Sequence, residues 1–560
     1  MTERSTPWLH VAAVLTLAVV SLPVATGEWT GGHDYYSYVW RAAEVRAQVV
    51  QGDLWPRWCP DFYWGHGYPF FVFYPPAVFV LSALISLLGP DLRWALLAVE
   101  VLGSGLLFYG TYRLARLYTR SPAAITGAAV ATLGIYRFVQ LYVRGDEAEA
   151  LATGLVPWIV AEAVLVGRSR DRAAMLRLGG LVAAVSLTHT LTAVMTCGVL
   201  AVLGIARLVE RGATERLQAF LRVGLASASG LVLAAAYWLP VLLLRPLVRT
   251  EQMTDRLPDG TSYWWADHFP TVMQRLWMPY EFGGSVPGPA DGMSMATSPV
   301  GWLFVALAVV GVLAAKSPDA RAMRPWVLAL VAIQVMLLPI SSPIWSVVPG
   351  LAWFQFPWRF LLLELVLVGL LAAWVAERIA LDKAAWLLLL PVLAAAPTAI
   401  ASYEHAASRP NPLDGRALDA LTDPTVLLEF QATSPVPLTT AGRNEYLPRA
   451  VTRPPKGPPA PTDQYLLLEQ AGAWRKYAVK AGGEVHLPWF DFPGVEVTID
   501  GVPIEHTTDE RGLIGVTAQP PAQIVEIRYG ASTPERVGTM ISAVAWIAWL
   551  LGWMALRRRP

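Results

Sequence analysis

The sequence predicts an α-helical membrane protein of the polytopic class that also carries a small β domain. Hydrophobic residues make up 55% of the 560 residues and charged residues only 15%, whereas soluble domains average about a quarter charged residues. A helix of about 20 apolar residues crosses a bilayer, and apolar runs of that kind recur between residues 8 and 402. After residue 463 the pattern changes to short alternating runs broken by Gly, Pro and Asp, which indicate β-strands.

About twelve segments are expected to span the bilayer. They lie at residues 8–26, 92–112, 122–142, 148–167, 176–190, 191–207, 222–243, 299–315, 325–340, 359–377, 385–402 and 538–556. The first is read as a retained helix, because no clear small-residue cleavage site follows it. The Arg-rich connectors between these segments all fall on one side if both termini are cytoplasmic, as the positive-inside rule requires.

This topology places one apolar segment, 73–89, outside the set of spans. If it crossed the bilayer, the arginines at 113–120 would fall on the outer side and break the alternation. We therefore expect a re-entrant or interfacial helix that begins after Pro75 and Pro76. The protein is predicted to lie in the inner or plasma membrane, with its polar loops and β domain on the outer face.

The chain is expected to divide into four parts. They are a transmembrane domain at 1–402 with a first outer loop at 27–91, a Pro-rich linker at 403–463, an outer β domain at 464–537, and a final helix with a basic tail at 538–560. The IDG sequence at 499–501 is the expected hairpin turn. The two cysteines lie far apart and imply no disulfide framework. No basic stripe indicates a nucleic-acid partner.

Candidate polar chemistry concentrates in the first outer loop, and Asp34 is its first acid. Asp34 begins a predicted helix over 35–51, where it either serves only as an N-cap or shares one helical face with Tyr38 and Arg41. In the second case a carboxylate beside aromatic rings could act as a general base toward a hydroxyl.

Two other residues of this loop have competing interpretations. Arg57 lies between tryptophans, which is typical of an interfacial aromatic belt but also suits bidentate binding of a lipid-linked phosphate. His66 lies in a glycine-rich bend, where a polar turn residue is commoner than a ligand.

The second outer turn carries four ionisable residues, Arg144, Asp146, Glu147 and Glu149. Acids at a helix N-terminus are favoured by its dipole, with Arg144 as their counter-ion. Alternatively, Asp146 and Glu149 share a face and meet Asp34 across the site. These three acids could bind Mg²⁺ or Mn²⁺, although they form no specific ligand code.

Two further motifs lie at predicted outer ends of spans. His189 is at the end of a helix hairpin, where a buried structural histidine is commoner than a catalytic one. Gln355 and Arg359 open a span after a proline, and an arginine at that depth either snorkels or binds an anion.

Together these motifs resemble a known family. HDYYSYVWR, GDLWPRWCPDFYWGHGYPFFVFYPP, VRGDEAEALATGLVP and FQFPWRF, in this order, are similar to the 6-pyruvoyl-tetrahydropterin-synthase-related membrane proteins. This group is close to the YfhO-like family, within the GT-C glycosyltransferase superfamily. EYLP and LPWFDFPGVEVTIDGVPI resemble the outer β domain of YfhO-like proteins, except that PGV stands at 493–495 where PGW is expected.

The resemblance implies a GT-C fold and an inverting glycosyltransferase of the cell envelope. A polyprenyl-phosphate sugar would be the donor, a glycan or lipid hydroxyl the acceptor, and membrane lipids further partners. Asp34 matches the first-loop base of such enzymes, and Glu149 the glutamate of an R-G-x-x-x-E pattern that begins at Arg144. Substrate-binding residues are then expected among His33, Tyr38, Arg41, Arg57, His66, Tyr74, Arg144, Asp146, Glu147, His189, Gln355 and Arg359.

Two other functions fit the same sequence. A lipid-linked-sugar transporter would need polar groups within the spans, for which Glu100, Glu162 and Glu364 are the candidates. A relative that binds the lipid-linked sugar without catalysis is the third interpretation.

Overall fold

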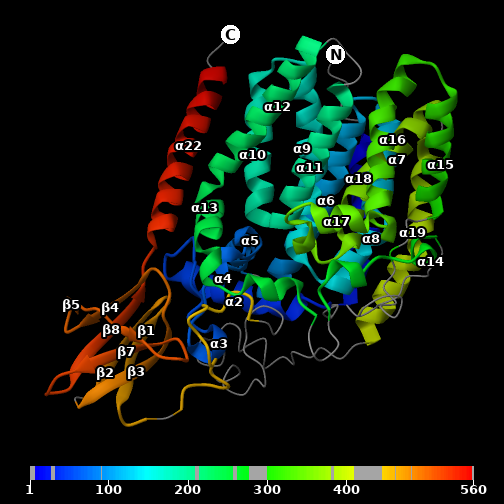
Figure 1. The fold of residues 1–560 in the computed structure, drawn as a ribbon. Helices are drawn as coiled ribbons and strands as arrows, with labels where there is room; N and C mark the ends of the chain where they lie inside the picture. The colour runs from blue at the N-terminus through cyan, green and yellow to red at the C-terminus, as the bar shows by residue number, and fades with distance from the viewer. Residues whose placement is uncertain are drawn as a thin grey trace.

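A helical bundle and a small β domain make up the protein, and the last helix joins them (Figure 1). The computed structural model describes residues 7–26, 32–89, 91–208, 213–256, 262–276, 295, 299–379, 384–408, 444–460, 462–480 and 482–557. The fold class predicted from the sequence, a mostly helical membrane protein with a small antiparallel β domain, is confirmed.

The helices fall into two sets along the chain. The first set is α1 (Pro7–Val20), η1 (Leu22–Thr26), α2 (Tyr35–Val50), α3 (Phe62–Gly65), α4 (Phe70–Phe73), α5 (Ala77–Ser86), α6 (Leu92–Ala115), α7 (Ser121–Thr132), α8 (Ile135–Phe138), the π-helical turn η2 (Val139–Arg144), α9 (Glu147–Arg168), α10 (Arg172–Thr188) and α11 (Thr190–Leu208). The second is α12 (Ala213–Leu233), α13 (Ala235–Leu244), η3 (Arg245–Leu247), η4 (Thr250–Thr254), η5 (Trp265–Asp267), α14 (Val272–Leu276), α15 (Pro299–Ala314), α16 (Pro318–Met336), η7 (Pro339–Ser341), α17 (Ser342–Val347), η8 (Leu351–Phe354), η9 (Pro357–Phe360), α18 (Leu361–Arg378), α19 (Ala384–Ser408) and α22 (Thr533–Arg557).

By length and composition, four helices in the described part of the chain can cross a membrane alone, or up to seven spans form if each bent pair counts as one. The bent pairs differ from the straight helices expected at 122–142, 222–243 and 325–340, with angles of 48°, 76° and 89° respectively. Two of the bends have identifiable causes. Leu365 leaves no room for a side chain at Gly134, whose extended backbone ends α7. Pro339 excludes the helical conformation from the residue before it, which is extended.

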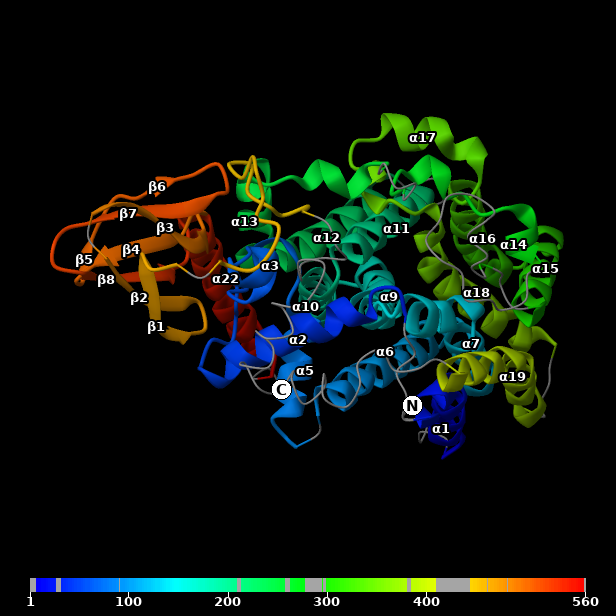
Figure 2. The ribbon, with the colours of Figure 1, turned by 90° about the horizontal axis from the view of Figure 1, so that it is seen from below.

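The segment at 73–89 is too short to cross the bundle. Its helix, α5, has ten residues, which is about 15 Å at 1.5 Å per residue, against a hydrocarbon core of about 30 Å. It lies beside α2 and α6 at the end of the bundle nearest the β domain (Figure 2). The expectation of a non-spanning helix agrees with this geometry.

The β domain consists of two antiparallel sheets. Its strands are β1 (Tyr465–Ala471), β2 (Trp474–Val479), β3 (Gly483–Phe490), β4 (Val495–Ile499), β5 (Val502–Pro503), β6 (Thr507–Thr508), β7 (Leu513–Ala518) and β8 (Gln523–Tyr529). One sheet has the order β1-β2-β8-β4-β5 and the other β3-β7-β6. The expected IDG turn joins β4 to β5, and both Asp500 and Gly501 have positive φ angles of 49° and 80°, as a type I′ turn requires.

The segment expected to be a linker differs from an extended connector at both ends. Helix α19 continues to Ser408, and residues 409–443 lie outside the described chain. From Asn444 the chain is packed: Tyr446, Leu447 and Val451 are buried in the same core as the first loop and the β domain. The Tyr446 amide donates to the Tyr68 hydroxyl at 2.9 Å. Aromatic and aliphatic residues in this stretch account for the difference, because they bury apolar surface.

The β domain docks on the first loop through one arginine and a set of rings. Buried Arg475 of β2 donates to the carbonyls of Gly65 and Pro60, and its guanidinium lies 3.6 Å from the Asp61 carboxylate. Trp58 stacks between Trp489 and Tyr529, with centroid distances of 5.5 and 5.0 Å. The loop and the β domain therefore share one core.

Replacing Arg475 with Ala should weaken the contact between the β domain and the first loop. The change leaves two buried carbonyls and the Asp61 carboxylate without a donor, and breaking such a buried pair costs about 3–5 kcal/mol. We expect faster limited proteolysis between residues 444 and 463 and faster amide exchange in the loop. Arg453→Ala is the matched control, since Arg453 pairs with Glu510 on the surface. Equal proteolysis of both variants would contradict a docking role for Arg475.

Candidate functional site

The first loop meets the second turn through backbone contacts that require glycine. The amides of His33 and Asp34 donate to the carbonyls of Val143 and Arg144 at 3.0 and 2.8 Å. A Cβ atom on Gly32 would lie 2.6 Å from the Gly145 nitrogen, which is closer than real contacts allow. This close approach fixes Asp34 beside the second turn.

Asp34 occupies the N-cap position of α2, but its side chain does not cap the helix. Its backbone is helical, with φ −99° and ψ −8°, and its carboxylate accepts no bond from the helix. Among the described residues it also has no hydrogen-bond or ion-pair partner, and the residue is partly exposed. Burial, followed by repulsion from Asp146, raises the pKa of Asp34, while Arg144, His33 and Arg41 lower it to a smaller extent.

The second turn is a compact ion cluster around Arg144. Its guanidinium lies 2.5 Å from an Asp146 oxygen and 2.6 Å from a Glu149 oxygen, and all three side chains are buried. Asp146 is the N-cap of α9 and accepts from the Glu149 amide at 2.9 Å and from the Tyr38 hydroxyl at 2.6 Å. Although burial alone would raise the pKa of Asp146, Arg144, His189 and these hydrogen bonds hold it below its usual range.

The third segment reaches the same cluster from the start of α18. Arg359 lies 3.6 Å from the second oxygen of Glu149 and donates to the Gln355 side-chain oxygen at 3.1 Å. Gln355, with φ of 61°, in turn donates to the Met253 carbonyl. The structure thus brings together the three segments that begin at Asp34, Arg144 and Gln355.

Two residues of this cluster were missed by sequence reasoning. The Tyr136 hydroxyl and the Gln140 amide donate to the same Glu149 oxygen at 2.7 and 3.0 Å. Both lie in a segment that the sequence indicates only as an apolar span. Their polar side chains, four residues apart near the end of that segment, were the available signal.

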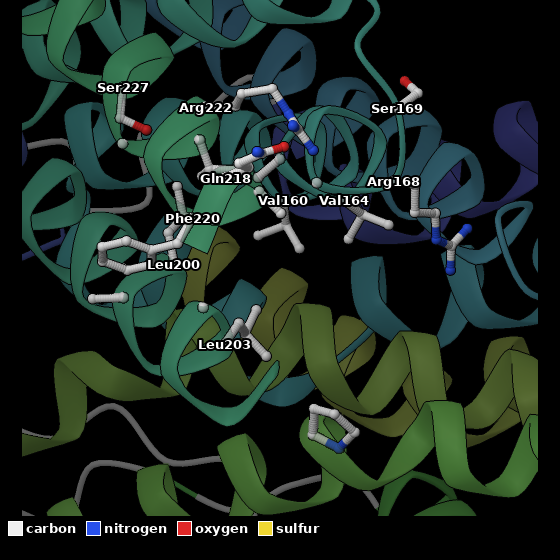
Figure 3. Close-up of a pocket in the computed structure, with 18 of the residues that line it drawn as sticks. Val160, Val164, Arg168, Ser169, Leu200, Leu203, Gln218, Phe220, Arg222 and Ser227 are labelled. Carbon is white, nitrogen blue, oxygen red and sulfur yellow. The ribbon is translucent and has the colours of Figure 1, made fainter. Parts of the chain in front are cut away.

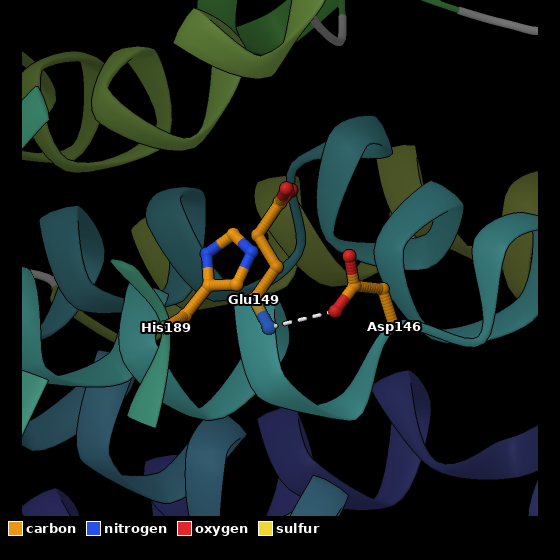
Figure 4. Close-up of side chains that lie close together, drawn as sticks. All are labelled: Asp146, Glu149 and His189. Carbon is orange, nitrogen blue, oxygen red and sulfur yellow. Dashed lines mark hydrogen bonds between the residues drawn. The ribbon is translucent and has the colours of Figure 1, made fainter. Parts of the chain in front are cut away.

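His189 faces Asp146 and Glu149 (Figure 4). One donor atom from each of these three residues lies within 4.8 Å of the others, and all three are buried. Asp34, the third metal ligand expected from the sequence, is not in this group, and His189 takes its place. Two carboxylates and an imidazole suit a divalent cation, although Arg144 already pairs with both acids. His189 also bonds the Thr192 hydroxyl at 2.8 Å.

Arg41 lies in an aromatic cage on α2, seven residues after Asp34. Its guanidinium carbon is 4.6 Å from the ring centre of Phe70, 5.1 Å from Tyr74 and 5.4 Å from Tyr38. The Tyr38 and Tyr74 hydroxyls are 2.8 Å apart. Arg41 is 5% exposed, and its side chain has neither a hydrogen bond nor an ion pair within the described chain, with Nε fully buried.

Two expected site residues have their contacts elsewhere. Arg57 donates to the Ala236 carbonyl of α13 and lies 3.9 Å from Glu535 of α22, so its partners belong to α13 and the final helix. His66 bonds the Tyr63 carbonyl at 2.7 Å and stacks on Phe490 of the β domain; burial lowers its pKa to about 4. Both residues therefore connect the first loop to other parts of the fold, which only the tertiary structure reveals.

Glu147, a further expected site residue, lies beside the cluster but does not take part in its hydrogen bonds. It is 1% exposed, and neither of its carboxylate oxygens has a hydrogen-bond partner. Unlike Asp34, it is closed off from solvent. Its position at the first turn of α9, one residue from Asp146, agrees with the helix-dipole interpretation more than with substrate contact.

Known proteins similar to this chain include a family and several solved structures. Residues 71–403, more than half of the chain, match the family described as 6-pyruvoyl-tetrahydropterin synthase related domain, membrane protein. None of the curated proteins matches the chain significantly.

The solved structures are similar at low identity. The Archaeoglobus fulgidus oligosaccharyltransferase is 14% identical, with a TM-score of 0.48 over 74% of this chain and 57% of that one. The arabinofuranosyltransferase AftD from Mycobacteria is 18% identical, with 0.45 over 71% and 27%. ArnT from Cupriavidus metallidurans, bound to undecaprenyl phosphate, is 14% identical, with 0.44 over 72% and 76%. The chain thus spans less than two thirds of the first two.

The apolar helices and the family match define a multi-pass membrane protein. More narrowly, the chain belongs to the 6-pyruvoyl-tetrahydropterin-synthase-related family of membrane proteins. The family resemblance indicated by its motifs is thereby confirmed.

Proposed function

We propose that this protein is a GT-C glycosyltransferase that moves a sugar from a polyprenyl phosphate to an acceptor hydroxyl. The observation that carries the proposal is the pairing pattern around Asp34. Asp146 and Glu149 are bonded to Arg144, whereas the Asp34 carboxylate has no partner in the described chain and is partly exposed. A base must accept a proton in an accessible position, and Asp34 meets that requirement.

In the proposed reaction, Asp34 takes the proton from the acceptor hydroxyl. The oxygen then attacks the anomeric carbon of the sugar, and the bond to the lipid phosphate breaks with inversion. Negative charge grows on the departing phosphate, so a preorganised cation nearby stabilises the transition state. The raised pKa of Asp34 makes its carboxylate a stronger base than an ordinary aspartate.

Arg41 is the cation best suited to the phosphate. Three other arginines expected for this role already have acidic partners: Arg57 has Glu535, Arg144 has two acids, and Arg359 has Glu149. Arg41 has none among the described residues and lies on the same helix as Asp34, seven residues later. Its aromatic cage would hold the guanidinium by cation–π contacts and offer an apolar wall to the lipid.

A divalent cation, if present, would be held by Asp146, Glu149 and His189. It would supply positive charge next to the leaving phosphate. The two carboxylates fit Mg²⁺ or Mn²⁺, and the imidazole favours Mn²⁺ of the two.

The outer face is proposed as the side on which transfer occurs. The site and the β domain lie at one end of the bundle, and the Arg-rich connectors at 113–120, 167–177 and 315–325 lie at the other (Figure 1). The positive-inside rule assigns the basic end to the cytoplasm. The β domain would then bind or cover the acceptor.

The acids within the spans favour an enzyme over a transporter. Glu162 pairs with Arg113 and Arg177, and Glu364 lies 2.6 Å from Arg275. Pairs of this kind hold helices together, so within the described residues two of the three candidate acids, Glu162 and Glu364, are not free to line a path for a sugar.

The proposal is tested by measuring whether the purified protein transfers a labelled sugar from a polyprenyl phosphate. The variant Arg41→Gln tests the role of Arg41 in this transfer. Removing one transition-state donor costs about 10²–10³ in kcat, so this variant should lose most activity while remaining folded. Arg57→Gln is the matched control and should retain wild-type kcat, although it loses stability through Glu535. Equal activity of Arg41→Gln and wild type would remove Arg41 from the site. If wild type transfers nothing from a range of lipid-linked sugars, the enzyme proposal fails.

A further inference from the structure

A cavity of about 600 Å³ lies between α9, α11, α12 and α16, far from the ion cluster. It is lined by the last turns of α9 and α11 and the first half of α12, which all lie at the basic end of the bundle (Figure 1). Ligand pockets commonly measure about 300–1,000 Å³, so this volume suits an organic group. The proposed reaction does not use it.

The walls of the cavity are apolar on one side. Figure 3 shows Val160 and Val164 of α9 near its centre, with Leu200, Leu203 and Phe220 to one side. Gly224 of α12 also lines it, and a Cβ atom there would meet nothing within 4 Å. Exposed Leu217, Leu221 and Leu225 lie on the same helix, so the apolar lining is continuous with a bilayer-facing surface.

The rim of the cavity is cationic. Arg168, Arg170 and Arg222 line it, and no carboxylate within the described residues pairs with any of them. Their hydrogen bonds are long: Arg168 to the Leu117 carbonyl at 3.3 Å, Arg170 to Gln218 at 3.4 Å and Arg222 to the Val166 carbonyl at 3.4 Å. The one acid in the lining, Glu215, is exposed. Most donor capacity of these guanidiniums thus remains for an anion.

We propose that this cavity binds an anionic glycerophospholipid from the leaflet at the basic end of the bundle. The phosphate would lie among the three guanidiniums, where charge-assisted bonds are strongest. An acyl chain would run along Val160, Val164 and Leu200 and leave toward the bilayer beside α12. Basic pockets between membrane helices on this side suit anionic head groups, and an apolar wall beside the cations distinguishes a lipid from free phosphate.

Native mass spectrometry of the full chain in detergent, titrated with phosphatidylglycerol or with phosphatidylcholine of the same acyl chains, tests the site. We expect phosphatidylglycerol to remain bound preferentially. The double variant Arg168→Gln/Arg222→Gln should bind it about 30-fold more weakly, because each arginine near an anionic head group contributes about a fivefold gain. Gly224→Leu places a side chain in the cavity without changing a charge. It should weaken the binding of phosphatidylglycerol, because the leucine takes the space of the acyl chain.

Arg172→Gln/Arg321→Gln is the matched control, since both residues are exposed at the same end and neither lines the cavity. Equal loss in the control and the Arg168/Arg222 variant would show diffuse surface attraction and overturn the proposal. Equal binding of the two phospholipids would also overturn it. Tighter retention of undecaprenyl phosphate or of inorganic phosphate than of phosphatidylglycerol would assign the cavity to a different ligand. Sugar transfer by these variants is expected to be unchanged, which separates this test from that of the proposed function.

Discussion

Replacing Asp34 with Asn should remove sugar transfer while leaving the fold intact. Asn has the shape of Asp but cannot accept the acceptor's proton, and a positioned base contributes about 10²–10⁴ in rate. The backbone contacts of Asp34 with Arg144 do not involve the carboxylate, so stability should change little. Transfer of labelled sugar by purified protein, together with its melting temperature, measures both effects.

The pH profile of the wild type gives a second measure of the same group. A base works only when deprotonated, so activity should fall as the pH drops through the pKa of Asp34. Because that pKa is raised above the ordinary value of 3.8, the acid limb should lie at higher pH than for a solvent-exposed aspartate. Asp53→Asn, an exposed acid of the same loop, is the control. Full activity of Asp34→Asn would exclude Asp34 as the base.

Replacing Arg144 with Gln should destabilise the protein more than any other single change at the site. Asp146 and Glu149 would then face each other, buried and without their shared counter-ion. Breaking one buried ion pair costs about 3–5 kcal/mol, and this residue makes two. We expect little folded protein in the membrane, measured by fluorescence-detected size exclusion and by thermal unfolding.

Neutralising the acids should restore the fold of this variant. Arg144→Gln combined with Asp146→Asn and Glu149→Gln removes all three charges and keeps the shapes of the two acidic side chains. Stability should therefore return in large part, although Arg359 loses its partner Glu149, while activity does not return. Arg120→Gln breaks a surface pair with Glu377 and should cost less than about 1 kcal/mol. If the triple variant is as unstable as the single one, the charges of the cluster do not hold the turn in place.

Much of the architecture follows from local sequence. Apolar runs, turn residues and basic connectors predict the helices, the β domain, the non-spanning segment at 73–89 and the IDG turn. The bends were not predicted. The one at Gly134 lies where the backbone is extended and where a side chain would meet Leu365, which is distant in sequence; only Pro339 gave a local signal.

The sequence predicted which segments meet at the candidate site. It predicted less well which side chains contact one another there. Acids and arginines in the outer loops indicated that Asp34, Arg144 and Arg359 belong together. Glu535, the ion-pair partner of Arg57, and Phe490, the stacking partner of His66, are more than 400 residues later in the chain, and nothing near either residue indicates them. His189 was expected among the substrate-binding residues but not as a metal ligand, because one histidine in an apolar helix pair carries no information about the acids it faces.

The joint between the first loop and the β domain has a consequence for biosynthesis. Arg475 lies 410 residues after the Gly65 carbonyl that it bonds. At about 5–20 residues per second, roughly 20–80 seconds of translation separate the two. Until the β domain leaves the ribosome and folds, Trp58 and the rings around it lack their packing partners. The loop that carries Asp34 is therefore among the first segments to be made and among the last to be completed, and a chain that stops before residue 465 would leave it unfinished.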